Sequence, residues 1–305
     1  MGSGDELVVE ISGLTKSFGS KKVLDGLDLS IPRGSVTGFL GPNGAGKSTT
    51  IRVLLGTYRW DAGTVRLLGG HPVEDAVRLH RDIAYVPGEV NLWPELTGGE
   101  CIDLLLSLRG VTVSTTRRAE LIDRFELDPT TRVSAYSKGN RQKVVLVAAF
   151  AVRPRLFIFD EPTSGLDPLM ENIFGDCVRE AAAAGTSVLL SSHILGEVSR
   201  LCDAVTIIRA GRTVEAGSLQ ALRHLARSRV SVDVLGSADR LRDIPGVTEF
   251  DSVTTTPEIS TVSFGVVDDQ LPAVIEALSG LSVRRLSVTP PTLEELFLAH
   301  YTRGG

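Results

Sequence analysis

The chain has 305 residues, of which 42% are hydrophobic and 23% charged, with a formal net charge of −5 and an isoelectric point near 5.6. This length favours two domains, because one hydrophobic core rarely extends beyond ~250–300 residues. The acidic balance argues against a general nucleic-acid-binding protein, which needs a concentrated basic face.

The first residues have neither the basic flank nor the apolar stretch of a signal peptide. The longest apolar run, residues 144–152, is shorter than the ~20 residues that cross a bilayer. We therefore expect a soluble, cytoplasmic chain whose membrane role would come through a partner. The cysteines are far apart and lack C-x-x-C spacing, so we expect buried free thiols in a reducing compartment at Cys101, Cys177 and Cys202.

Two strands are expected near the N-terminus, at residues 7–11 and 27–31, the second with the period-two alternation of a strand that has one wet face. Phe18 lies between them. Its ring is at a suitable distance upstream of the next motif to stack on a nucleotide base, but an isolated phenylalanine is more often part of a core. The local sequence leaves both interpretations open.

A buried strand is expected at 36–40, followed by a glycine-rich loop and a helix, which is the context required of the phosphate-binding pattern G-x-x-x-x-G-K-[ST]. Glycines let the backbone turn its N–H groups toward phosphate oxygens, and the helix dipole adds to the attraction. Lys47 can reach the outer phosphates and Ser48 can bind Mg²⁺. The loop consists of Gly41, Pro42, Asn43, Gly44, Ala45, Gly46, Lys47, Ser48 and Thr49.

Further strands are expected at 63–69 and 83–86. Thr97 and Glu100 have the spacing of a capping box that starts a helix, and a second helix is expected at 117–125. Ser137 is an expected N-cap for the helix that covers 144–151, and a helix N-terminus of this kind can bind an anion, although most such sequences are only helix starts.

Residues 156–159 read as a fully buried strand with two carboxylates, Asp160 and Glu161, at its carboxyl end. Asp160 can hold Mg²⁺ through its water shell, and Glu161 can orient or deprotonate a water molecule. A strand at 188–192 delivers His193 to the same edge of the sheet, where it could donate to the outermost phosphate. Between these strands, Asp167 and Pro168 suit the cap and first position of a helix that ends at Gly185.

Together these elements resemble the ATP-binding cassette (ABC) family, over roughly residues 7–218. The resemblance rests on six motifs in register: Phe18, the loop Gly41–Ser48, the signature-like Ser137-Lys138-Gly139-Asn140-Arg141-Gln142, Asp160-Glu161, Ser164–Asp167 and His193. It implies an α/β fold, a P-loop NTPase cassette core with a helical subdomain at about 95–153, which uses ATP and Mg²⁺.

The resemblance also implies roles for these residues. Glu161 would act on the attacking water, His193 would contact the γ-phosphate and Lys47 would bind the outer phosphates. Ser48 and Asp160 would hold the metal. Nucleotide would be bound by Phe18 and the loop Gly41–Thr49, and by Ser137, Gly139 and Asn140.

The family further implies partners. Two cassettes pair head to tail around ATP, so the signature of one subunit completes the site of the other. The partner cassette would be a second copy or a related subunit, and Ser164–Asp167 would communicate across the dimer. A separate membrane-spanning permease would place the chain on the inner face of the membrane, and no nucleic acid is implied. One departure concerns the family segment that commonly ends in glutamine, where this chain has Gly88 and then Glu89.

The C-terminal part has a different character. A basic linker helix is expected at 219–229, followed by an accessory domain at 230–305. One strand of this domain is expected at 246–250, and the domain's order β-α-β-β-α-β predicts a small ferredoxin-like α+β fold. A final helix would open at 291–297 with Thr292 and Glu295 as a capping box. This ending resembles the extension of cassette ATPases that serve drug, antibiotic or polysaccharide exporters.

The resulting hypothesis is an ATP-hydrolysing subunit of an ABC exporter. Two alternatives stay open at this point: a cassette ATPase that works without a membrane partner, and a regulatory nucleotide-binding module with lost turnover. The sequence names neither the transported substrate nor, beyond the analogy with exporters, the direction of transport.

Overall fold

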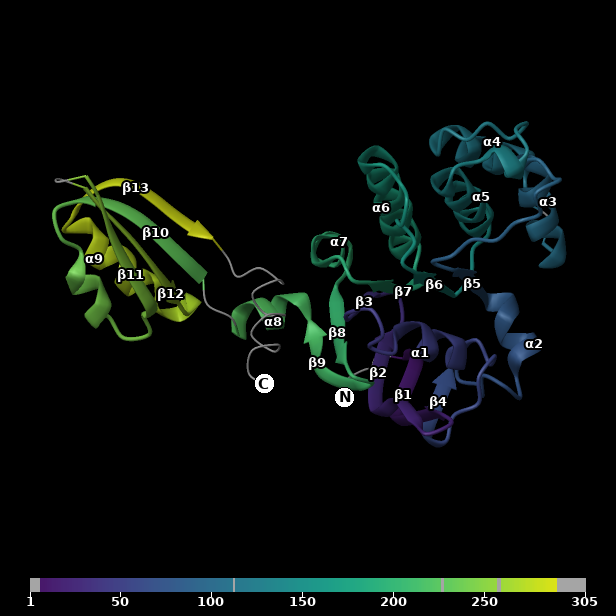
Figure 1. The fold of residues 1–305 in the computed structure, drawn as a ribbon, viewed down its shortest axis with the longest axis horizontal. Coiled ribbons are helices and arrows are strands. Elements are labelled where there is room, and N and C mark those ends of the chain that lie inside the picture. Colours follow the sequence, from purple (N-terminus) through teal and green to yellow (C-terminus); the bar gives the residue numbers. More distant parts are fainter. Residues whose placement is uncertain (1–5, 112, 226–227, 257–258, 290–305) are drawn as a thin grey trace. The chain divides into compact units, whose positions relative to one another are not determined.

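The structure is a computed structural model that describes residues 6–111, 113–225, 228–256 and 259–289 (Figure 1). The chain divides into two compact units, Met1–Ala216 and Gly217–Gly305. No helix in these described stretches combines the length and apolarity needed to span a membrane.

The first unit alternates strands and helices, as an α/β domain does. In chain order its elements are β1 (Leu7–Phe18), β2 (Lys21–Pro32), β3 (Val36–Leu40), α1 (Lys47–Leu54), β4 (Ala62–Leu67), α2 (Ala76–Leu79), η1 (His80–Asp82), β5 (Ile83–Val86), α3 (Gly98–Leu108), α4 (Thr115–Arg124), η2 (Val133–Ala135), α5 (Lys138–Phe150), β6 (Leu156–Asp160), α6 (Pro168–Ala183), β7 (Ser187–Ser192), α7 (Leu195–Leu201), β8 (Ala204–Arg209) and β9 (Arg212–Ser218).

The main sheet has the strand order β5-β6-β7-β3-β8-β9, and the pairings from β5 to β8 are parallel. Parallel strands end at the same edge, so the loops that follow β3, β6 and β7 meet there. The register makes this concrete, since Asp160 pairs with Ser191 and Leu40 pairs with Ser192. The three expected catalytic loops therefore lie side by side.

Both faces of the main sheet are buried, which explains its near-continuous apolar strands. On β6, Ile158 belongs to the cluster shared with α1 and the small antiparallel sheet β2-β1-β4, whereas Phe157 and Phe159 face the opposite cluster. That second cluster includes buried residues of α3, α4, α5 and α6. A hydrophobic cluster therefore packs against each face of the sheet and supports the strands that end at the site.

The expected helix starts are confirmed. Thr97 and Glu100 form a capping box, with Thr97 accepting from the Glu100 N–H at 3.2 Å and Glu100 accepting from the Thr97 N–H at 2.8 Å. Ser137 caps α5, which begins at Lys138, six residues before the expected helical stretch. Asp167 caps α6, and Pro168 occupies the first helical turn.

The second unit contains a four-stranded antiparallel sheet in the order β11-β12-β10-β13. Its elements are α8 (Leu219–Leu225), β10 (Ser228–Leu235), η3 (Asp239–Asp243), β11 (Thr248–Thr256), β12 (Ile259–Val266), η4 (Asp268–Gln270), α9 (Leu271–Ser279) and β13 (Ser282–Thr289). This is the expected ferredoxin-like order, with its first helix reduced to the 3₁₀ turn η3.

Several boundaries differ from the sequence-based expectation. Strand β1 runs to Phe18, seven residues beyond the expected end at 11, because its pairing with β2 continues to the Phe18–Lys21 pair. Strand β10 begins at Ser228, inside the expected linker, because Ser228 pairs with Val266 of β12. Strand β11 runs to Thr256, six residues beyond the expected end at 250, because its pairing with β12 continues to the Thr256–Ile259 pair. The helix expected at 291–297 lies outside the described residues.

Candidate functional site

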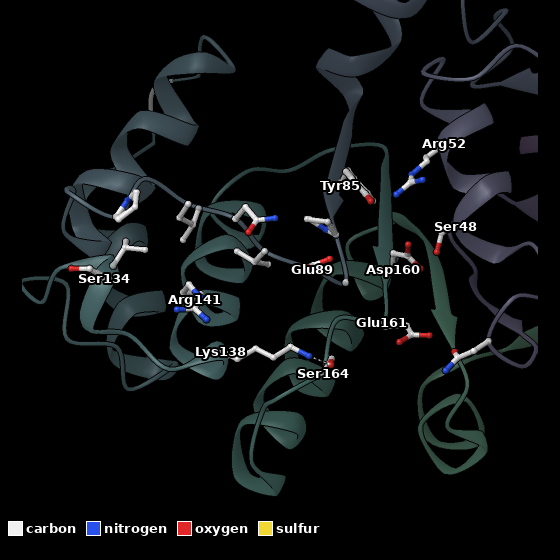
Figure 2. A pocket seen from close by; sticks show the side chains of 18 residues that line it. Ser48, Arg52, Tyr85, Glu89, Ser134, Lys138, Arg141, Asp160, Glu161 and Ser164 are labelled. Carbon is white, nitrogen blue, oxygen red and sulfur yellow. Dashed lines mark hydrogen bonds between the residues drawn. The ribbon is translucent and has the colours of Figure 1, made fainter.

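A pocket of about 970 Å³ opens at the carboxyl edge of the main sheet (Figure 2). The side chains that line it include Ser48 and Arg52 from α1, Tyr85 from β5, Asp160 and Glu161 from the end of β6, and Lys138 and Arg141 from the start of α5. Residues 87–92, in the loop after β5, line it as well. Metal and general-base candidates from distant parts of the sequence therefore share one cavity.

The glycine-rich loop needs its glycines for the fold as well as for phosphate. Gly46 has φ 114°, a left-handed conformation that other residues rarely adopt. A Cβ at Gly41 would lie 2.5 Å from the Ile208 carbonyl oxygen, and one at Gly46 would lie 2.6 Å from Leu24. The loop is thus packed tightly between β2 and β8 before any ligand is considered.

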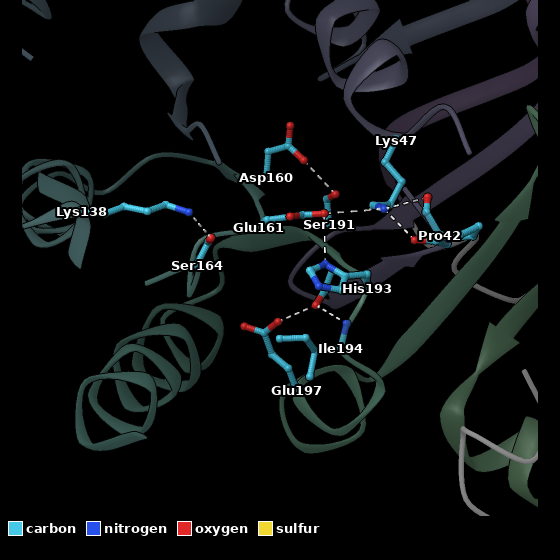
Figure 3. A network of polar contacts seen from close by, with 12 residues as sticks. Pro42, Lys47, Lys138, Asp160, Glu161, Ser164, Ser191, His193, Ile194 and Glu197 are labelled. Atoms are coloured by element: carbon cyan, nitrogen blue, oxygen red, sulfur yellow. Dashed lines mark hydrogen bonds and ion pairs between the residues drawn. The ribbon is translucent and has the colours of Figure 1, made fainter. Parts of the chain in front are cut away.

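Lys47 lies inside this loop with only 5% of its surface exposed. Its ammonium group donates to the carbonyl oxygens of Gly41 at 2.6 Å and Pro42 at 3.2 Å, and lies 3.7 Å from the Glu161 carboxylate (Figure 3). Burial lowers the pKa of Lys47, while Glu161 and Asp160 act against that shift. A buried cation of this kind is well placed for the charge of outer phosphate groups.

Asp160 is 7% exposed and accepts a hydrogen bond from the Ser191 hydroxyl at 2.9 Å, across adjacent strands. Ser48 and Asp160 line the same cavity. Across the described residues, no group of three or more His, Cys, Asp or Glu side chains gathers as a protein-only metal cage. A hydroxyl and one carboxylate fit a Mg²⁺ ion that keeps several waters and phosphate oxygens as ligands.

Glu161 and His193 approach each other as expected from the neighbouring strand ends. His193 Nδ1 lies 3.2 Å from Glu161 Oε1, and the same oxygen is the one nearest Lys47. Glu161 has φ 52°, an unusual conformation for a residue with a side chain. Strained backbone of this type persists where the surroundings hold it and is common at active sites.

The signature-like segment opens α5. Ser137 accepts a hydrogen bond from the Asn140 N–H at 3.2 Å, and Lys138 donates to the Ser164 hydroxyl at 2.6 Å. A Cβ at Gly139 would lie 2.4 Å from the Gly165 carbonyl oxygen. Within one protomer, this segment therefore packs against the loop that follows Glu161.

Phe18 ends β1 and is 43% exposed, so it is not a core residue. Its ring makes an edge contact with Tyr58, with centroids 5.2 Å apart, and the Lys16 ammonium lies 5.1 Å from the ring centroid. This exposure favours the base-stacking interpretation over the core interpretation.

Several pocket residues were not anticipated from the sequence. Tyr85 on β5 faces the cavity, and burial together with Asp160 raises its pKa to about 12, so it is a neutral hydroxyl at ordinary pH. A tyrosine in a short apolar run carries no signal that separates it from core aromatics.

Gly88 is the residue at which the sequence departs from the family pattern. A Cβ there would lie 2.7 Å from the Asp160 carbonyl oxygen, so the site has no room for a side chain at this position.

Comparison with known proteins decides the family. A family model described as ABC transporter matches residues 24–164, and one described as the DrrA1-3-like ATP-binding protein C-terminal domain matches residues 217–301. The daunorubicin resistance ATP-binding protein DrrA3 of Streptomyces coeruleorubidus is 35% identical over 96% of this chain and 95% of its own length. The chain belongs to the ABC transporter ATP-binding proteins.

Further relatives and solved structures support the same family and fold. The uncharacterised ABC transporter ATP-binding protein YdbJ of Bacillus subtilis is 30% identical over 98% of both chains. A solved ATP-binding subunit of an ABC transporter is 32% identical, with a TM-score of 0.66 over 72% of this chain and 92% of that one. The ABC cassette MJ0796 bound to ADP and phosphate, at 23% identity and a TM-score of 0.63 over 69% and 98% of the two chains, supports the fold.

The family and fold class inferred from the motifs, and the exporter type inferred from the C-terminal extension, are thereby confirmed. As an ABC transporter ATP-binding protein, the chain binds and hydrolyses ATP and is the ATPase subunit of an exporter-type transporter. ABC ATP-binding subunits dimerise, as the cassette MJ0796 does, and work with separate membrane permeases.

Proposed function

We propose that Glu161 is the general base for ATP hydrolysis, with Lys47 and His193 binding the outer phosphates. The observation that carries this proposal is the convergence of these three side chains, since one Glu161 oxygen lies 3.7 Å from Lys47 and 3.2 Å from His193. They come from three loops at one sheet edge, as phosphoryl-transfer sites require of groups that must be held in position.

The nucleotide would lie along the glycine loop, with its base against Phe18 and its phosphates on the backbone N–H groups of residues 41–49. Mg²⁺, held by Ser48 and through water by Asp160, would neutralise charge on the phosphates. Ser191 fixes the Asp160 carboxylate in this orientation at 2.9 Å. Glu161 takes a proton from the water that attacks the terminal phosphorus, and ADP leaves.

We also propose that hydrolysis requires a second cassette, a second copy of this chain or a related subunit. Ser137, Gly139 and Asn140 begin α5, and the positive end of its helix dipole suits a phosphate presented by the partner. The chain carries one phosphate loop, so a complete pair of sites needs two chains.

The permease is proposed to contact a largely apolar groove of about 330 Å³ next to the segment Pro87–Trp93. Trp93 and Leu108 on its rim are 42% and 69% exposed. Binding there would hold this subunit on the inner face of the membrane.

The test is the Mg²⁺-dependent ATPase activity of the purified chain. Glu161→Gln should reduce kcat by at least about 100-fold, the range for loss of a general base, while ATP binding persists. ATP should then trap a dimer that size-exclusion chromatography detects. Glu74→Gln, which alters an exposed carboxylate in the same unit, is the control. Full turnover by the Glu161 variant would refute the assignment.

A second experiment addresses the partner. Leu108→Glu should abolish co-purification of a polytopic membrane protein from detergent extracts and leave the ATPase activity of the isolated subunit unchanged. Retention of that membrane protein by the variant would place the permease contact elsewhere.

A further inference from the structure

Glu197 is a carboxylate that the proposed chemistry does not use. It is 5% exposed on α7, whose neighbouring buried residues Val198 and Leu201 are apolar. Burying a carboxyl group is costly unless hydrogen bonds compensate it, so packing alone would be served better by a hydrophobic side chain. The contacts of Glu197 indicate what the carboxyl group does instead.

One Glu197 oxygen accepts a hydrogen bond from the Ser192 hydroxyl at 2.6 Å. The Ser192 oxygen in turn accepts from the Ile194 N–H at 3.0 Å. Ser192 and Ile194 flank His193, so these two hydrogen bonds fix the backbone on both sides of the histidine (Figure 3). The His193 ring then reaches Glu161 at 3.2 Å.

The same carboxyl group is also close to the loop that carries the proposed base. The hydroxyl of Thr163, two residues after Glu161, lies near enough to favour the ionised carboxyl, and Thr163 is itself 6% exposed. The second Glu197 oxygen has no hydrogen bond of normal geometry to the described residues. Glu197 therefore lies between the loops that follow β6 and β7.

The surrounding charges are few. Burial and Glu171 raise the pKa of Glu197, whereas the Ser192 and Thr163 hydroxyls and Arg200 lower it. The Ser192 hydroxyl has a single proton, which it donates to Glu197. The interaction thus needs an acceptor at position 197, which an amide oxygen also provides.

We propose that Glu197 is a positioning residue for hydrolysis, whose carboxyl group holds Ser192 and Ile194 and thereby aims His193 at Glu161 and the terminal phosphate. The inference rests on the proposed roles of Glu161 and His193. Misplacement of a catalytic group by about 1 Å can lower a rate by up to about 100-fold, so removal of this support should reduce kcat measurably.

The test is steady-state ATPase kinetics with a separate measurement of nucleotide binding by the full chain. Glu197→Ala and Ser192→Ala should each lower kcat by about tenfold or more and leave KM and ATP affinity within about twofold, because the phosphate loop is untouched. Glu197→Gln should retain most of the activity, since its amide oxygen accepts from Ser192. Glu74→Gln is again the control.

A double-mutant comparison separates positioning from general damage to the fold. Combining Glu197→Ala with His193→Ala should cost no more than His193→Ala alone, because Glu197 acts through the histidine. Wild-type kcat in Glu197→Ala or Ser192→Ala, an additive loss in the double variant, or equal losses in the Ala and Gln variants would overturn the proposal. If Glu197→Ala does not fold, the kcat values of Ser192→Ala and Glu197→Gln test the proposal: it requires a loss in the first and near wild-type activity in the second.

Failure of the two proposals is distinguishable. Turnover by Glu161→Gln would refute the assigned base. If Glu161→Gln and His193→Ala lose turnover but Glu197→Ala retains wild-type turnover, only the inference about Glu197 is overturned.

Discussion

Lys138 donates a hydrogen bond to the Ser164 hydroxyl at 2.6 Å, joining the start of α5 to the loop that follows β6. Gly139 lies against the next residue of that loop, Gly165, with no room for a Cβ between them. The signature-like segment is therefore in direct contact, within one protomer, with the loop that carries the proposed general base.

Gly139→Ala should destabilise the first unit by about 1–3 kcal/mol, the usual cost of overpacking, and should lower ATPase activity. The new Cβ would meet a backbone oxygen, at 2.4 Å, which cannot move as a flexible side chain can. Urea unfolding and ATPase assays measure both effects. Gly196→Ala is the matched control, because a Cβ there meets nothing within 4 Å. Equal stability of the two variants would contradict the packing argument.

Gly88→Gln should lower ATPase activity several-fold, although it introduces the residue that related cassettes commonly carry. The Cβ would lie 2.7 Å from the Asp160 carbonyl oxygen and would displace the carboxylate proposed to hold Mg²⁺. Glu89→Gln, at an exposed neighbouring position, supplies the same amide without the clash. A gain of activity in Gly88→Gln would show that this edge of the sheet accommodates the side chain.

Phe18→Ala should raise KM for ATP about tenfold with little change in kcat, since stacking on a base contributes about 1–3 kcal/mol and acts on substrate and transition state alike. Phe18→Tyr should preserve KM because it keeps the ring. Val77→Ala, at a side chain 79% exposed, controls for loss of surface area. An unchanged KM in Phe18→Ala would place the base elsewhere.

The Glu197 carboxyl group should make stability depend on pH. Because the folded-state pKa is raised above the ordinary value of 4.5, the native state binds more protons than the unfolded state in the window above that pH. The contribution of Glu197 to the free energy of unfolding therefore falls as pH rises through this window. As pH rises through this window, Glu197→Gln should become progressively more stable relative to wild type, as measured by denaturant unfolding at a series of pH values. Parallel stability–pH curves for the two proteins would contradict the raised pKa of Glu197.

Most features that the sequence predicted are local. The glycine loop, the capping box of Thr97 and Glu100, and the Asp167 cap each depend on partners within a few residues, so spacing alone specifies them. The strand at Ile83–Val86 was predicted with its observed bounds because Pro87 and Gly88 end the apolar run. The ferredoxin-like order followed from the sequence of element types.

Features that the sequence did not predict join residues that are far apart along the chain. The contacts of Ser191 with Asp160 and of Lys138 with Ser164 span 31 and 26 residues. Glu197 resembles any other polar residue of a short helix until its burial is seen. Helix η3 is a 3₁₀ turn of five residues, a length at which periodicity does not distinguish helix types.

The sequence by itself determined which residues are the candidates for the chemistry and at which ends of which strands they lie, because these properties follow from residue type, spacing and hydrophobic period. Only the tertiary structure decided how those ends are aligned. Strand register brings Asp160 opposite Ser191, and packing between loops sets the Glu161–His193 distance of 3.2 Å. Such alignment arises from contacts between distant segments, whose geometry no local pattern encodes.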